Sequence, residues 1–233
     1  MSNINFVFFH TGDITYPQLL VKTINKFNPG SRIYFLTGEE NDSIDGVYKT
    51  IRFSFDKNNL MEARLKGFES LQLMEPAIYI DTDVLVVKKI PIELFQDHDI
   101  FLCSRSFGKN TLFNPKHLEK YNIEEYKNKT KGEVYPFIAC FTYCKNFLFW
   151  KDCLSILNKL DKKFHFWYGD QECLRIINNL NTYDIGYLEE SLVCTLPEFS
   201  KPGDNCYSVH FRGTRKKLIS KAAQFILSDK YLY

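Results

Sequence analysis

Hydrophobic positions in the first hundred residues form two kinds of pattern that alternate along the chain. Short apolar runs, typical of buried strands, occupy residues 4–9, 77–80 and 84–87, and two further short strands are predicted at residues 32–36 and 47–53. Between them, residues 15–27 and 60–74 carry apolar side chains at spacings of three and four, which predicts amphipathic helices. Strands that alternate with helices are joined by right-handed crossovers in a parallel sheet. We therefore predict an α/β fold with a Rossmann-like, mostly parallel central sheet flanked by helices.

The second half of the chain is less regular and predicts a smaller antiparallel portion. Residues 107–136 are polar and mixed in charge, and we expect a loop with a short helix there. Further strands are expected at residues 137–143, 185–188 and 207–211, and helices at residues 148–160, 170–180 and 214–227. The last of these helices has an apolar stripe beside a basic face. No repeat, Gly/Ser linker or low-complexity stretch interrupts the chain, so we expect residues 1–233 to form a single domain.

Composition and charge narrow the function classes. The 233 residues include 30 Lys and Arg against 28 Asp and Glu, and a net charge of +2 does not favour a nucleic-acid partner. Because no apolar run reaches about 18 residues, we expect no membrane span. The start of the chain lacks the basic residues of a signal peptide. The seven cysteines include no C-x-x-C pair, which argues against a zinc site or a disulfide framework. We therefore expect a cytoplasmic protein.

The acidic turn between two apolar runs is the most informative string in the chain. Asp81 and Asp83 stand at i and i+2, so both carboxylates project to one side of an extended backbone. They follow a strand, at the sheet edge where open α/β sheets bind ligands. Two close carboxylates repel each other unless a cation joins them, which indicates a divalent metal. One alternative is a solvated turn in which the two side chains cap backbone amides. A second is an aspartyl phosphatase, which the Leu at position 85 and the late position of the motif disfavour.

Several pieces of the chain, taken in order, resemble the GT-A fold glycosyltransferases and, within them, glycosyltransferase family 8. They are Phe8-Phe9-His10-Thr11-Gly12-Asp13-Ile14-Thr15-Tyr16, Ala63-Arg64-Leu65, Asp81-Thr82-Asp83, Gly169-Asp170-Gln171 and His210-Phe211-Arg212-Gly213-Thr214-Arg215-Lys216. The resemblance implies a GT-A domain whose residues 1–104 bind the nucleotide and whose residues 105–233 bind the sugar and the acceptor. The chain departs from the family at Phe137-Ile138-Ala139-Cys140, which lacks the usual Asn that contacts the donor sugar. The sugar is therefore left open.

The resemblance also implies roles for single residues. Asp13 would accept the uracil N3–H, Tyr16 would stack on the ring, and Arg64 would steady the donor and the neighbouring carboxylates. The implied metal ligands are Asp81, Asp83 and His210. Further donor contacts are implied for Thr11, Thr82, Ala139, Asp170, Gln171, Gly213 and Lys216, with Lys216 on the diphosphate. The nearby Arg212, Arg215 and Lys217 either share that task or form a solvated surface.

The function implied is the metal-dependent transfer of galactose or glucose from a UDP-sugar to a glycan, a lipid-linked glycan or another hydroxyl acceptor. Oxygen and imidazole ligands suit Mn²⁺, with Mg²⁺ as the alternative. The family retains configuration, and Gln171 or Asp170 would be the group beneath the anomeric carbon. Because glutamine is a poor nucleophile, we expect front-face attack. The alternatives are a catalytically silent nucleotide-sugar-binding module and a glycogenin-like self-glucosylating protein. The basic tail helix either packs on the domain or lies against an anionic membrane, at its inner face.

Overall fold

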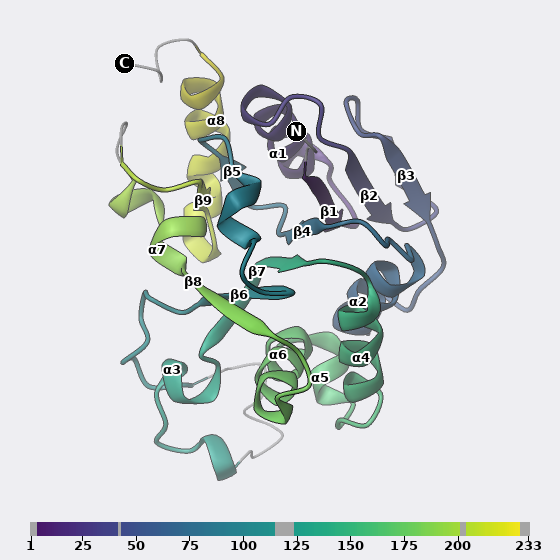
Figure 1. Cartoon of the computed structure of the whole chain (residues 1–233), viewed down its shortest axis with the longest axis vertical. Helices are drawn as coiled ribbons and strands as arrows, with labels where there is room; N and C mark the ends of the chain where they lie inside the picture. The colour runs from purple at the N-terminus through teal and green to yellow at the C-terminus, as the bar shows by residue number, and fades with distance from the viewer. Residues whose placement is uncertain (1–3, 42, 115–123, 201–203, 229–233) are drawn as a thin grey trace.

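The structure is a computed structural model that describes residues 4–41, 43–114, 124–200 and 204–228 (Figure 1). The described residues form a seven-stranded sheet in the order β3-β2-β1-β4-β7-β6-β8. Parallel pairs join β1 to β2 and β4, β2 to β3, and β6 to β8, whereas β7 runs antiparallel to both of its neighbours. The strands are β1 (Asn5–Phe9), β2 (Ile33–Thr37), β3 (Lys49–Arg52), β4 (Ala77–Ile80), β6 (Ile100–Ser104), β7 (Phe137–Cys144) and β8 (Ile185–Glu189). The predicted fold class, an α/β fold with a mostly parallel sheet, is confirmed.

A smaller antiparallel sheet lies beside the main one and pairs β5 (Val84–Val86) with β9 (Ser208–His210). The apolar run at residues 84–87 therefore does not continue the main sheet. The chain turns at Asp81–Asp83 and leaves it. The turn carries the chain from β4 into the small sheet, while the Asp81 amide still donates to the Cys140 carbonyl of β7.

Helices cover both faces of the main sheet (Figure 1) because successive strand residues point to opposite faces. In β1, Phe6 and Phe8 join the core under α1 (Thr15–Phe27). Val7 points to the opposite core, which includes residues of α2 (Leu60–Ser70), α4 (Leu148–Leu157) and α6 (Gly169–Leu180). The remaining α-helices of the described chain are α3 (Lys131–Val134), α5 (Lys163–Phe166), α7 (Glu190–Val193) and α8 (Ile219–Leu227).

Several boundaries differ from the predicted ones. The helix expected over residues 60–74 ends at Ser70, and Gln72 adopts a left-handed φ of 47° that no α-helix accommodates. The tail helix begins with a 3₁₀ segment, η5 (Gly213–Leu218), before α8. Strand β6 was not predicted. Within residues 107–136 the expected short helix is α3, whose Thr130 and Glu133 form a capping box, and residues 115–123 lie outside the described residues.

The tail helix α8 packs on the domain. Ile219, Ala223 and Ile226 are buried in a cluster with residues of β5, β9 and α1. The Lys26 Nζ of α1 also donates to the carbonyls of Ile226 and Leu227, which are the negative end of the α8 dipole. Packing therefore accounts for the apolar stripe of this helix, and residues 229–233 lie outside the described part of the chain. None of the described helices has the length and apolar character that crossing a bilayer requires.

Candidate metal centre and substrate cleft

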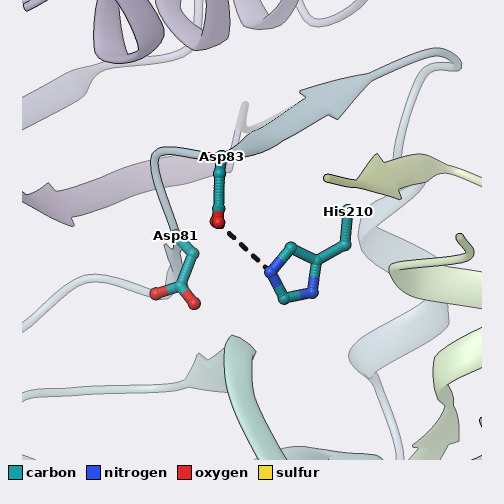
Figure 2. Close-up of side chains that lie close together, drawn as sticks. All are labelled: Asp81, Asp83 and His210. Carbon is teal, nitrogen blue, oxygen red and sulfur yellow. Dashed lines mark ion pairs between the residues drawn. The ribbon is translucent and has the colours of Figure 1, made fainter. Parts of the chain in front are cut away.

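Two strand pairings bring Asp81, Asp83 and His210 together. Asp81 follows β4, and its amide is held by the carbonyl of Cys140 in β7 at 3.0 Å. In the small sheet, Val84 of β5 is paired with His210 of β9. Figure 2 shows the three side chains converging on one space from the acidic turn and from β9. One ligand atom from each residue lies within 4.8 Å of the other two.

The Asp83 carboxylate contacts two basic side chains. Its Oδ1 lies 3.2 Å from His210 Nε2, and its Oδ2 lies 3.1 Å from Lys216 Nζ. Burial alone would raise the pKa of Asp83, but the two cationic neighbours outweigh burial and lower that pKa to about 2. His210 is only 4% exposed, and burial opposes its charged form, yet Cys140 and Asp83 beside it raise its pKa to about 10. His210 and Lys216 therefore both favour the ionised form of the Asp83 carboxylate.

Arg64 of α2 links the acidic turn to α6. One guanidinium nitrogen lies 2.7 Å from Asp81 Oδ1 and donates to the Ala139 carbonyl at 2.8 Å, and the other lies 3.1 Å from Asp170 Oδ2. The Arg64 side chain is 12% exposed, so the two ion pairs are largely removed from water. Burial raises the pKa of Asp81 to about 6, with Asp83 adding to the rise and Arg64 opposing it. Arg64 thus holds two carboxylates that would otherwise be costly to bury.

The start of α6 presents Gln171 to the cleft. Gln171 Oε1 accepts a hydrogen bond from the Arg105 guanidinium at 2.8 Å, and Arg105 Nε donates to the Tyr135 carbonyl at 2.7 Å. The preceding Tyr168 has a left-handed φ of 63°, which is uncommon for a residue with a Cβ. Gly169 is packed so closely on α5 that a Cβ would collide with the carbonyl of Phe164. The left-handed conformation of Tyr168 and the close packing of Gly169 therefore fix the backbone that leads into Asp170 and Gln171.

A cleft of about 740 Å³ opens over the acidic turn and the start of α6. Its lining includes the predicted site residues Thr11, Tyr16, Arg64, Asp81, Thr82, Asp83, Ala139, Asp170, Gln171, His210, Gly213 and Lys216. Asp13 does not line the cleft. It is exposed, and its carboxylate accepts hydrogen bonds from the amide and hydroxyl of Thr15 at the start of α1.

Some residues that line the cleft were not predicted as site residues. Arg105, Lys131, Trp167 and Tyr168 belong to segments that are far from the acidic turn in sequence. His10 stands in one of the strings that we singled out, but without a role. Its ring contacts Thr82 Oγ1 at 3.1 Å and the Asp13 carbonyl at 2.7 Å, and this links the first turn of the chain to the acidic turn.

The residues fit a divalent cation. The group offers two carboxylates and one imidazole, which is an oxygen-rich donor set suited to Mn²⁺ or Mg²⁺ rather than to a thiolate-bound metal. His210 Nδ1 is buried and has no hydrogen-bond partner among the described residues, while Nε2 faces Asp83. Both carboxylates face one space, so a bound cation would relieve their mutual repulsion.

The comparisons with known proteins bear on the fold. No sequence model of a protein family matches the chain, and no curated protein matches it. Among solved structures, it resembles the galactosyltransferase LgtC in complex with donor and acceptor sugar analogues, with a TM-score of 0.58, 15% identity and 95% of each chain covered. An active-site mutant of LgtC in which a glutamine is replaced by glutamate matches with a TM-score of 0.59, again with 15% identity and 95% of each chain covered. The chain therefore has the GT-A glycosyltransferase fold.

Proposed function

We propose that this protein is a metal-dependent glycosyltransferase that moves a hexose, galactose or glucose, from a UDP-sugar to a hydroxyl acceptor with retention of configuration. One observation carries the proposal. In a fold shared with a galactosyltransferase, Asp81, Asp83 and His210 bring their ligand atoms within 4.8 Å of one another on the wall of a large cleft. An isolated pair of aspartates has many explanations, but a third ligand from a strand far along the chain does not arise from a solvated turn.

The proposed cation is Mn²⁺, with Mg²⁺ as the alternative. Asp81, Asp83 and His210 would hold it, and it would stabilise the negative charge of the departing diphosphate. Lys216 is half-exposed, so it can move from Asp83 to a phosphate oxygen once a cation takes its place beside that carboxylate. Gly213, with a φ of 65° and open space where a Cβ would stand, would let the phosphates approach the backbone.

The proposed nucleotide site is the part of the cleft lined by Thr11 and Tyr16. Tyr16 would stack on the uracil, and Asp13 would accept its N3–H. Asp13 is exposed and bonded to Thr15, so this contact requires its carboxylate to turn toward the base. In our proposal residues 1–104 bind the nucleotide and residues 105–233 bind the sugar and the acceptor, within one catalytic domain.

The proposed chemistry is front-face attack rather than double displacement. Gln171 Oε1 already accepts from Arg105, and a neutral amide held in that way is a weak nucleophile. Asp170 is committed to Arg64 at 3.1 Å and to the amide of Gln171 at 2.7 Å. Asp170 and Gln171 would therefore orient the donor sugar, and a diphosphate oxygen of the donor would take the proton from the acceptor hydroxyl.

The test is a panel of UDP-sugars and other nucleotide sugars assayed for nucleotide release, with Mn²⁺, with Mg²⁺ and with EDTA. We expect release from UDP-galactose or UDP-glucose that depends on the metal and is lost in Asp83→Asn. Lys22→Gln, which alters an exposed lysine of α1 outside the cleft, is the matched control. Mass spectrometry of the protein after incubation distinguishes transfer to a free acceptor from self-glucosylation. If no donor is bound or cleaved in a metal-dependent manner, the proposal is wrong.

A further inference from the structure

The wall of the cleft beyond the acidic turn carries cations that have no counter-ion. The side chains that line the cleft include six cations, Arg64, Arg105, Lys131, Arg212, Arg215 and Lys216, and three carboxylates, Asp81, Asp83 and Asp170. Four of the cations are paired. Arg64 and Lys216 contact the carboxylates of the cleft, Arg212 contacts Glu190 at 2.8 Å, and Arg215 contacts Glu198. Among the described residues, no ion pair is found for Arg105 or Lys131.

Of these two residues, Arg105 gives the stronger evidence that an anion binds in the cleft. Its guanidinium donates only to neutral groups, the Tyr135 carbonyl and the Gln171 amide oxygen, and its remaining N–H groups have no partner among the described residues. Burial, and then the neighbouring Arg212, lower the pKa of Arg105, while Glu190 opposes them. A partly buried guanidinium without an anion is costly, and its planar fork matches a carboxylate or a phosphate.

The donor supplies an anion for one of these two cations at most. The two charges of a divalent cation are balanced by Asp81 and Asp83, and Lys216 matches one of the two negative charges on the diphosphate of a UDP-sugar. Arg105 contacts Gln171, and among the described residues no ion pair joins it to Asp81 or Asp83. Galactose and glucose are neutral, so at least one of the two unpaired cations still lacks an anion after the donor is bound.

We propose that the acceptor is an anionic sugar, one that carries a carboxylate or a phosphate, and that Arg105 and Lys131 bind this group. The inference rests on the proposed transferase function and specifies its acceptor. Lys131 begins α3, and its ammonium group forms no ion pair with any described residue that binding would have to break. Arg105 has a second role, because it also holds Gln171.

The experiment uses the full chain with UDP-galactose or UDP-glucose and Mn²⁺, and matched pairs of acceptor probes. The pairs are methyl glucoside against methyl glucuronide, and glucose against glucose 6-phosphate. We measure kcat/KM for transfer and, separately, binding of each probe to the enzyme loaded with UDP and Mn²⁺. We expect the anionic member to be preferred at least tenfold, with a preference that falls as NaCl is raised.

Substitutions of Arg105 and Lys131 test whether these two residues cause the preference for the anionic probe. Lys131→Gln should lose most of the preference through a higher KM for the anionic probe. Arg105→Lys, which keeps the charge but not the fork, should retain part of it, whereas Arg105→Gln should lose it. The matched control is Lys129→Gln, an exposed lysine two residues away and outside the cleft.

Three results would overturn the inference. The first is that neither anionic probe binds the loaded enzyme more tightly than its neutral partner, whether or not turnover is seen. The second is a preference that Lys131→Gln and Arg105→Gln leave intact. The third is a preference for UDP-glucuronate as donor with neutral acceptors, which would assign the anion to the donor. Metal-dependent hydrolysis of the donor without acceptor is measured in parallel, and its absence would count against the proposed function instead.

Discussion

Arg64 offers a direct measure of how much the acidic turn depends on one buried cation. Arg64→Gln removes the guanidinium between Asp81 and Asp170 and leaves both carboxylates without a counter-charge. Asp170 is 6% exposed and Asp81 is partly buried. Removing one partner of a buried ion pair costs about 3–5 kcal/mol of unfolding free energy. With a urea m-value of about 2 kcal/mol/M, the midpoint should fall by about 1.5–2.5 M.

The loss should depend on pH in a defined direction. The pKa of Asp81 in the folded protein already lies above its ordinary value, at about 6, and removal of Arg64 raises it further. The unpaired carboxylate is therefore most costly when it is ionised, above that pKa, and protonation relieves the cost as the pH falls. We expect the difference in unfolding free energy between wild type and Arg64→Gln to be largest near pH 8 and to shrink toward pH 5.

The assay is urea unfolding in EDTA at pH 8 and pH 5, followed by circular dichroism and by tryptophan fluorescence. The matched control is Arg32→Gln, because Arg32 pairs with Glu75 at 3.1 Å but both side chains are about half exposed. That exposed pair should contribute only about 0–1 kcal/mol. The reasoning is refuted if Arg64→Gln costs no more than Arg32→Gln, or if its cost is the same at both values of pH.

Three other changes test the site. Asp83→Asn should lower metal-dependent turnover by about 10²–10³-fold, whereas Gln171→Ala should keep measurable activity, and equal loss in both would contradict front-face attack. Mn²⁺ affinity, measured by calorimetry, should fall about 100-fold or more from pH 7.5 to pH 5.5. The first reason is that Mn²⁺ must displace the proton of His210, whose pKa is raised to about 10, and the second is that Asp81 must stay ionised. A flat profile would exclude these residues as ligands. Gly169→Ala should lower the thermal midpoint and the activity together, because its Cβ would collide with the backbone of α5, and an unchanged midpoint would contradict this packing.

Local sequence patterns predicted most of the first half of the fold. The alternation of strand-like and helical segments identified α1, α2 and the strands β1 to β4. Burial on both faces of the sheet leaves near-continuous apolar runs in β1, β2 and β4, whereas the edge strand β3 is partly exposed and mixed in polarity. Strand β6 is as apolar as these, with Ile-Phe-Leu-Cys over residues 100–103, but it follows the 3₁₀ segment η1 (Ile92–Phe95) and not an amphipathic α-helix, so the strand–helix alternation does not mark it. Its pairing with β7 and β8 comes from distant segments that no local pattern specifies.

For the site as well, the sequence predicted some residues, and only the folded structure showed which side chains contact them. The sequence by itself determined that Asp81 and Asp83 stand two residues apart directly after an apolar strand. In the structure their carboxylates come together across a turn and not along an extended backbone. Only the tertiary structure decided their partners. Pairing of β5 with β9 brings His210 to Asp83, and packing of α2 and α6 brings Arg64 between Asp81 and Asp170. Whether Arg105 is neutralised or left without an anion depends on which side chains surround it after folding. The burial of Arg105 and the charges around it are set by the folded structure, and the spacing of residues along the chain does not encode them.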